Sequence, residues 1–414
     1  MKKIANYING ELRAPASNQY IDNYNPATGS VYSLIPNSGE EDVQFAIKSA
    51  REAFDSWSSL SNAKRASWLD KIANAIESRM DELALAESID NGKPLSLATS
   101  VDIPRARDNF KFYATAIMHY ASESHRTGDG IINYTLRKPV GVAACISPWN
   151  LPLYLFSWKI APALAAGNTV VAKPSEITPM TAYLLSEICV EIGLPAGVLN
   201  IVHGLGATTG NAIISSNEID LVSFTGGTST GAHIAKIVAP KFKKMSLELG
   251  GKNPNIIFDD CDFEKALKTT VHSSFENQGQ ICLCGSRILV QRGIYEKFKN
   301  AFVEQVGNMR IGNPLNEDSQ LGAIVSKPHF DKILSYIEIA KSEGGKILTG
   351  GLPISLADDN KDGWFIAPTI IEGLDQQCRT NQEEIFGPIV TIQPFDTIEE
   401  ALELANSTEY GLAA

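Results

Sequence analysis

The feature that most constrains the fold is an alternation of short apolar runs and helical stretches that starts at Val140. The apolar runs lack polar alternation, which indicates strands buried on both faces of a sheet. Alternation of strands and helices of this kind predicts a parallel, doubly covered sheet and hence an α/β fold. The predicted strands lie in VGVAACI, NTVVAKPS, GVLNIVHG, DLVSFTGG, SLELGG and NIIFDD.

The length of the chain and a second series of runs indicate more than one domain. The chain has 414 residues, too many for one ordinary core, and a second alternating series begins after about Asp259. We therefore expect a domain boundary near Gly250. Ahead of the first series we predict a helix opened by a Ser38–Glu41 capping box, and a second long helix from about residue 64 to residue 89.

Composition excludes several classes of function. The formal net charge is -11, and no basic stripe is long enough to follow a phosphate backbone, so we expect no nucleic acid partner. The most apolar segment, residues 151–172, carries Lys159, Pro162 and Gly167, so we interpret it as a buried helix turning into a strand and expect no membrane span. No apolar run of signal-peptide length follows the N-terminus, and six sparse cysteines favour a reducing cytoplasm.

The stretch NQGQICLCGSR places Cys282 and Cys284 two residues apart among glycines and amides. A metal site needs two more ligands at suitable spacing, and His272 and Cys261 form no such pair, so we expect no metal. A redox pair usually has two residues between its cysteines, whereas only one residue separates Cys282 from Cys284. Two small buried cysteines are a strong alternative. A nucleophile needs partners that hold an oxyanion and move protons.

Two such partners are present in the sequence. Asn150 follows a predicted strand in PWNLP, at the end where α/β sheets bind ligands, and its amide can donate to an oxyanion. Closing a turn is the plainer interpretation of Asn150. Glu248 stands between leucines in LELGG, where apolar surroundings would suit a general base, although a solvent-facing strand residue fits the pattern equally.

Two further strand ends suit a dinucleotide. Lys173 and Glu176 follow a predicted strand and can bind ribose hydroxyls, or simply start a helix. The stretch FTGGT, residues 224–228, opens a helix, and its glycines let backbone N–H groups approach phosphate. It is not the usual G-x-G-x-x-G fingerprint and is weak alone.

In this order, the motifs resemble those of the NAD(P)-dependent aldehyde dehydrogenase superfamily, across essentially the whole chain. The resemblance implies a Rossmann-type parallel-sheet cofactor domain, an α/β catalytic domain and a bridging β-hairpin. The blocks that carry it are residues 148–152, 173–176, 224–231, 247–252, 279–287 and 383–388.

The resemblance also assigns roles to residues. It implies that Cys282 is the catalytic thiol, Asn150 the oxyanion donor and Glu248 the general base, with Cys284 a bystander. Glu176 favours NAD over NADP, because a carboxylate accepts from a 2′-hydroxyl and repels a 2′-phosphate. The cofactor-binding residues it implies are Ser147, Trp149, Lys173, Ser175, Glu176, Gly206, Phe224, Gly226, Gly227, Leu249, Glu384 and Phe386.

A closer resemblance is to the branch that oxidises 2-aminomuconic and 2-hydroxymuconic semialdehydes. It is carried by residues 146–176 and 274–287 and by DIPR, where Arg105 matches an arginine that binds the substrate's carboxylate. A surface arginine on a helix is the alternative. Other hypotheses are a broad aliphatic aldehyde dehydrogenase, a thiol esterase, and a fragment that binds NAD without turnover.

The resemblance implies a division into domains and an oligomer. We expect an NAD-binding domain over residues 1–120 and 140–249, an oligomerisation hairpin over 121–139, and a catalytic domain over 250–414. Family members continue beyond the position of Ala414, so we expect the C-terminal part of the catalytic domain to be missing here. The expected partners are a small aldehyde and further copies of the chain, as a dimer or tetramer. Gly227 departs from the serine of many members.

Overall fold

The computed structural model describes residues 1–414, which divide into two units by their internal contacts. The first unit comprises residues 1–23, 32–86 and 99–248, and the second comprises residues 24–31, 87–98 and 249–414. Two short segments of the N-terminal half thus group with the second unit, whereas the sequence-based domain boundaries kept them with the first. The finer domain assignment remains a prediction.

The first unit is built on a seven-stranded sheet. Its order is β12-β11-β8-β9-β10-β2-β3, and the five strands from β12 to β10 are parallel. The strands are β2 (Asn6–Ile8), β3 (Glu11–Arg13), β8 (Val142–Ile146), β9 (Thr169–Lys173), β10 (Leu199–Ile201), β11 (Leu221–Thr225) and β12 (Lys244–Glu248). All residues of β9 and nearly all of β8 are buried, as expected for strands covered on both faces.

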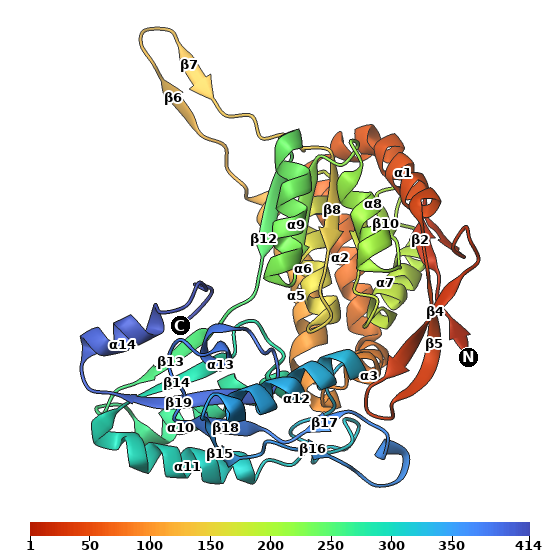
Figure 1. The fold of residues 1–414 in the computed structure, drawn as a ribbon. Helices are drawn as coiled ribbons and strands as arrows, with labels where there is room; N and C mark the ends of the chain where they lie inside the picture. The colour runs from red at the N-terminus through yellow and green to blue at the C-terminus, as the bar shows by residue number, and fades with distance from the viewer. The chain divides into compact units, whose positions relative to one another are not determined.

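Helices cover both faces of this sheet, as Figure 1 shows. Helices α2, α5, α6 and α7 pack together on one side, and α1, α8 and α9 lie on the other. Their bounds are α1 (Glu40–Ser58), α2 (Asn62–Ser78), α3 (Met80–Asn91), α5 (Ile103–Met118), α6 (Pro152–Ala165), α7 (Met180–Glu191), α8 (Asn211–Ser215) and α9 (Thr228–Val238). The predicted α/β fold is confirmed.

Two predictions about the early helices were wrong. The N-cap of α1 is Gly39, whose N–H donates to Asp42 Oδ2 at 3.1 Å, so Ser38 and Glu41 form no capping box. The predicted helix from about residue 64 to 89 is two helices, because Arg79 between α2 and α3 adopts φ -118° and ψ 23°. The Arg79 guanidinium reaches Glu82 and Glu187 at 2.7 and 3.0 Å, which stabilises the break.

A hairpin extends from the first unit between α5 and β8. Its strands β6 (Ser124–Arg126) and β7 (Ile132–Tyr134) are antiparallel and fully exposed. Figure 1 shows it reaching away from the helices of this unit. Three side chains on this arm, Ile132, Tyr134 and Leu136, are each at least 65% exposed.

The second unit contains a five-stranded sheet with the order β13-β14-β19-β18-β15, in which only β15 is antiparallel. Phe275, Phe298 and Phe302 pack in its main hydrophobic core. The elements are β13 (Asn253–Ile257), β14 (Gly285–Gln291), β15 (Lys346–Thr349), β16 (Pro353–Ile354), β17 (Phe365–Ile366), β18 (Thr369–Glu372), β19 (Ile389–Phe395), α4 (Leu95–Leu97), α10 (Phe263–Phe275), α11 (Tyr295–Gly307), α12 (Lys327–Ser342), α13 (Arg379–Gln382) and α14 (Ile398–Ala405).

A further small sheet pairs β1 (Lys2–Lys3), β5 (Ser30–Pro36) and β4 (Tyr20–Asn25).

Candidate functional site

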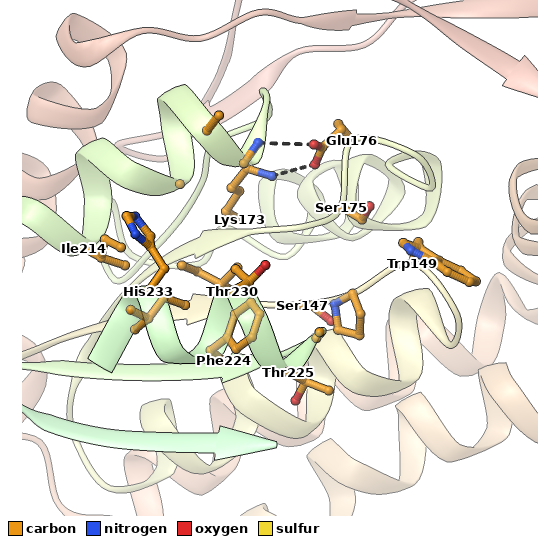
Figure 2. A pocket seen from close by; sticks show the side chains of 18 of the residues that line it. Ser147, Trp149, Lys173, Ser175, Glu176, Ile214, Phe224, Thr225, Thr230 and His233 are labelled. Carbon is orange, nitrogen blue, oxygen red and sulfur yellow. Dashed lines mark hydrogen bonds and ion pairs between the residues drawn. The ribbon is translucent and has the colours of Figure 1, made fainter. Parts of the chain in front are cut away.

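A cavity of about 670 Å³ lies in the first unit at the carboxyl ends of β8, β9 and β11. The order of the strands along the chain reverses between β8 and β11, which is the point where open α/β sheets bind ligands. Figure 2 shows Trp149 at one end of this cavity and Ile214 and His233 at the other. Its lining includes Ser147, Trp149, Lys173, Ser175, Glu176, Gly206, Phe224, Gly226 and Gly227, all predicted from the sequence.

Lys173 and Glu176 form an ion pair on the wall of this cavity (Figure 2). Lys173 Nζ lies 2.9 Å from Glu176 Oε2, and the Gly206 N–H donates to Oε1 at 3.2 Å. Burial alone would raise the pKa of Glu176, but the Lys173 ammonium and the N–H donors outweigh it and hold that pKa below its usual range. Glu176 is therefore an oriented carboxylate that can accept a hydrogen bond from a ribose hydroxyl.

The cavity also has free hydrogen-bonding capacity and room for backbone approach. Ser147 Oγ is buried and has no hydrogen-bond partner. Gly227 precedes α9, and a Cβ added there would meet nothing within 4 Å, so its surroundings are open to a ligand. A Cβ at Gly226 would instead lie 2.5 Å from the Phe224 ring. An open glycine before a helix N-terminus suits a pyrophosphate, so these residues fit a dinucleotide.

Several lining residues were missed from the sequence. Thr230 and His233 lie on α9, and Ile214 lies on α8. His233 Nε2 is 3.0 Å from Asn211 Oδ1, which links the two helices at that end of the cavity. Helical spacing from the FTGGT stretch would have found Thr230 and His233, because residues four and seven positions beyond Gly226 lie on one face of the helix that follows it.

In the second unit, Cys282 lies in a loop between η4 (Glu276–Gly279) and β14. Asn277, Gln278 and Gly279 adopt positive φ values of 52°, 58° and 69° in succession. Such left-handed residues are costly unless their surroundings hold them. The amides of Gln278 and Gln280 supply that support, because they hydrogen-bond the backbone of residues 322–325 at 3.0–3.2 Å.

The two cysteines of this loop differ in environment. Cys284 is 8% exposed, and burial raises the pKa of its thiol to about 12. Cys282 is partly exposed. Asn253 Nδ2 donates to the carbonyls of Cys282 and Cys284 at 2.7 and 3.0 Å, which fixes the backbone beneath both thiols. Only Cys282 is accessible, so it is the nucleophile candidate and Cys284 is a packed thiol.

Glu384 and Phe386 share a small cavity of about 20 Å³ with Cys282. The Gly251 N–H donates to Glu384 Oε1 at 3.0 Å. Burial raises the pKa of Glu384, and the Gly251 hydrogen bond opposes that rise. Lys252 also lines this cavity, and burial lowers the pKa of its ammonium to about 7.

The other predicted site residues, Asn150, Glu248 and Leu249, lie at or just beyond the ends of strands β8 and β12. Asn150 is 2% exposed and lies in the short loop between β8 and α6. Glu248 ends β12 and is exposed, so its expected enclosure between leucines is not observed. Its carbonyl accepts the Gly226 N–H at 3.0 Å, which ties the end of β12 to the cavity of the first unit. Leu249 follows at the start of the second unit's long segment.

Arg105 lies in the first turn of α5 and is exposed. Its guanidinium carbon is 5.8 Å from the ring centres of both Tyr154 and Trp158, on α6. It forms no ion pair with a carboxylate of the protein, whereas Arg107 on the same helix binds Glu77 at 2.7 Å. Arg105 therefore presents a cation supported by aromatic rings with its donors available for a ligand.

Other classes of site receive no support from the structure. No group of three or more His, Cys, Asp or Glu side chains in residues 1–414 is arranged to hold a metal ion. None of the helices has both the length and the apolarity needed to cross a membrane. All six cysteines are free thiols, so Cys282 and Cys284 are not joined.

Comparison with known proteins agrees with this chemistry. The Aldehyde dehydrogenase family matches residues 13–414. The chain is 48% identical over 414 residues to 2-aminomuconic semialdehyde dehydrogenase of Mus musculus, covering 99% of this chain and 85% of that protein. It is 42% identical over 420 residues to 2-hydroxymuconic semialdehyde dehydrogenase of Pseudomonas sp. (strain CF600), covering 100% and 86%.

Solved structures are equally similar. An NAD+ complex of aldehyde dehydrogenase from Bacillus cereus superposes with a TM-score of 0.96 at 38% identity, over 100% of this chain and 84% of that one. Betaine aldehyde dehydrogenase from Staphylococcus aureus with NAD+ gives 0.95 at 40% identity, over 98% and 81%. The chain therefore belongs to the aldehyde dehydrogenase family and is an oxidoreductase that oxidises small aldehydes with NAD.

Proposed function

We propose that the substrate is a small unsaturated semialdehyde that carries a carboxylate, of the 2-aminomuconic or 2-hydroxymuconic class. The observation that carries this proposal is Arg105, an exposed guanidinium without a protein carboxylate, supported by two rings of α6. Helix α6 begins two residues after Asn150, so both candidate substrate contacts belong to neighbouring elements of the first unit. A planar guanidinium fork binds a carboxylate through two hydrogen bonds.

The relatives support the same class. Several proteins 42–48% identical to this chain carry names of muconic semialdehyde dehydrogenases. The alternative within the family is a dehydrogenase of broad aliphatic aldehydes, for which Arg105 would have no partner in the substrate.

In the proposed mechanism, Cys282 Sγ attacks the aldehyde carbon as a thiolate. The Asn150 side chain and the Cys282 backbone N–H donate to the oxyanion that forms. Bound NAD would supply the acceptor for the hydride of this carbon. Glu248 then takes a proton from water, the water attacks the resulting thioester of Cys282, and the carboxylic acid and the thiol are released.

In the same proposal, the first-unit cavity holds NAD. Glu176 accepts from a hydroxyl of the adenosine ribose, and the approach to Gly226 and Gly227 receives the pyrophosphate. Glu384 and Phe386 contact the nicotinamide end. Ser147, Trp149, Ser175, Gly206, Phe224 and Leu249 complete the proposed cofactor-binding set.

We also propose a homo-oligomer and a cytoplasmic setting. The exposed apolar side chains of the β6–β7 hairpin support the homo-oligomer, because such side chains usually mark a surface that binds a partner. Six free cysteines support the second.

The test measures NADH formation from 2-hydroxymuconic semialdehyde and from a simple aliphatic aldehyde. We expect Arg105→Ala to lower kcat/KM about 10- to 100-fold on the semialdehyde alone, because a charge-assisted contact is lost. Arg107→Ala is the matched control, since Arg107 is already paired with Glu77 and Asp108. Equal losses on both aldehydes, or none, would favour the broad aliphatic function.

Two further measurements, ester cleavage and thermal unfolding with NAD, separate the remaining hypotheses. Ester cleavage unaffected by NAD and by Glu176→Ala, without NADH from any aldehyde, would indicate a thiol esterase. Thermal stabilisation by NAD without turnover would indicate an NAD-binding chain without activity.

A further inference from the structure

The segment from Glu384 to Phe386 is held by one face of α12. His329 Nε2 lies 2.7 Å from the Phe386 carbonyl oxygen, and Lys332 Nζ donates to the Glu384 carbonyl at 3.1 Å. The two side chains are three residues apart, so they project from the same face of the helix. Both contacts are with carbonyl oxygens, which means that α12 fixes the main chain of this segment.

The segment needs such restraint. Phe386 has a φ of 63°, in the left-handed region that a bulky residue rarely adopts. The ring of His329 lies edge-on to the ring of Phe386, with centroids 6.2 Å apart and an interplanar angle of 64°. On the other side, the Gly251 N–H holds the Glu384 carboxylate at 3.0 Å. Backbone and side chain are thus anchored by different elements of the second unit.

The chemistry of His329 suits a fixed donor. A carbonyl oxygen can only accept, so Nε2 must carry the proton. Burial lowers the pKa of His329 to about 4, although the Phe386 carbonyl favours the charged form. The ring is therefore neutral near pH 7, with its single N–H directed at Phe386.

We propose that His329 and Lys332 are positioning residues that hold Glu384 and Phe386 in the conformation that receives NAD. This inference rests on the proposed assignment of Glu384 and Phe386 to the nicotinamide end of the cofactor. Loss of either contact lets the segment leave its strained conformation, which raises the KM for NAD. Ester hydrolysis by the Cys282 thiol requires no cofactor, so we expect its rate to be unaffected.

The experiment compares wild type with His329→Leu, His329→Gln and Lys332→Met. The first readout is the KM for NAD in NADH formation, and the second is hydrolysis of p-nitrophenyl acetate without NAD. We expect His329→Leu to raise the KM for NAD about five- to tenfold, with ester hydrolysis within about twofold of wild type. Glutamine can donate to the same carbonyl, so His329→Gln should recover most of the loss.

The control for Lys332→Met is Lys341→Met. Lys341 lies on the same helix and pairs with Glu338 at 2.7 Å, away from the segment, so this variant should match wild type. The inference is overturned if His329→Leu leaves the KM for NAD unchanged, or if ester hydrolysis falls in parallel. It is also overturned if glutamine is as damaging as leucine, because the hydrogen bond would then not be the cause.

A Glu384→Gln variant separates this inference from the assignment beneath it. If Glu384→Gln leaves the kinetics of NAD unchanged, both the assignment and the inference fail. If it weakens NAD while the α12 variants do not, the inference alone fails.

Discussion

Gly279 offers a quantitative test of how the loop before Cys282 is held. Its φ is 69°, and a Cβ added there would lie 2.3 Å from the Gly387 carbonyl oxygen and 3.0 Å from the Pro388 nitrogen. Alanine pays about 1 kcal/mol for the left-handed conformation. Displacing backbone that is itself anchored adds roughly 1–3 kcal/mol. We expect Gly279→Ala to lower the free energy of unfolding by about 2–4 kcal/mol.

The assay is thermal unfolding, in parallel with ester hydrolysis by the Cys282 thiol. For a protein of this size the loss corresponds to a Tm roughly 2–5 °C lower, and hydrolysis should fall because the loop shifts. Gly373→Ala is the control, since Gly373 has a φ of 80° and nothing within 4 Å of an added Cβ. It should cost only about 1 kcal/mol. If the two variants lose the same stability, the contact with Gly387 is not a constraint and the reasoning is refuted.

Three further outcomes are expected. Glu176→Gln should raise the KM for NAD about tenfold and reduce the preference for NAD over NADP, because the carboxylate that repels a 2′-phosphate is gone. An unchanged ratio of kcat/KM for the two cofactors would contradict this. The pKa of Lys252 is about 7 in the folded protein and 10.5 ordinarily, so between these values the unfolded chain binds more protons and the free energy of unfolding rises with pH. Lys252→Met should remove this rise, measured by urea unfolding at pH 7, 8.5 and 10. An unaltered dependence of the free energy of unfolding on pH would count against it. Cys284→Ser should keep turnover within about threefold, whereas Cys282→Ser should abolish NADH formation, and equal losses would disprove the bystander role.

The sheet of the first unit was predictable from the sequence because its strands are apolar throughout and are separated by helices. The runs at VGVAACI and NTVVAKPS became β8 and β9 with all but one residue buried. Polar residues at the ends of these strands converge because parallel strands end at the same edge. Periodicity alone was sufficient for this part of the fold.

Other features depend on tertiary contacts that no local pattern records. The break at Arg79 is stabilised by Glu187, more than 100 residues away in the sequence. The supporting contacts of His329 and Lys332 are likewise remote from the segment that they hold. The exposure of Glu248 could not be inferred from flanking leucines, because neighbours in a strand face opposite sides.

The hydrogen bonds from Gln278 and Gln280 end on the backbone of residues 322–325, not on its side chains. These hydrogen bonds do not depend on the side chains of that stretch, which are restricted for other reasons: Ala323, Ile324 and Val325 are buried, and a Cβ at Gly322 would lie 1.9 Å from the Gly92 carbonyl oxygen. A change in its length is a different matter. One inserted or deleted residue would displace the carbonyl and N–H groups that the two amides bind, and it would shift the start of α12 at Lys327, which carries His329 and Lys332. For protein engineering, this segment is therefore a spacer whose number of residues must be kept, in addition to the small and apolar side chains that its burial requires.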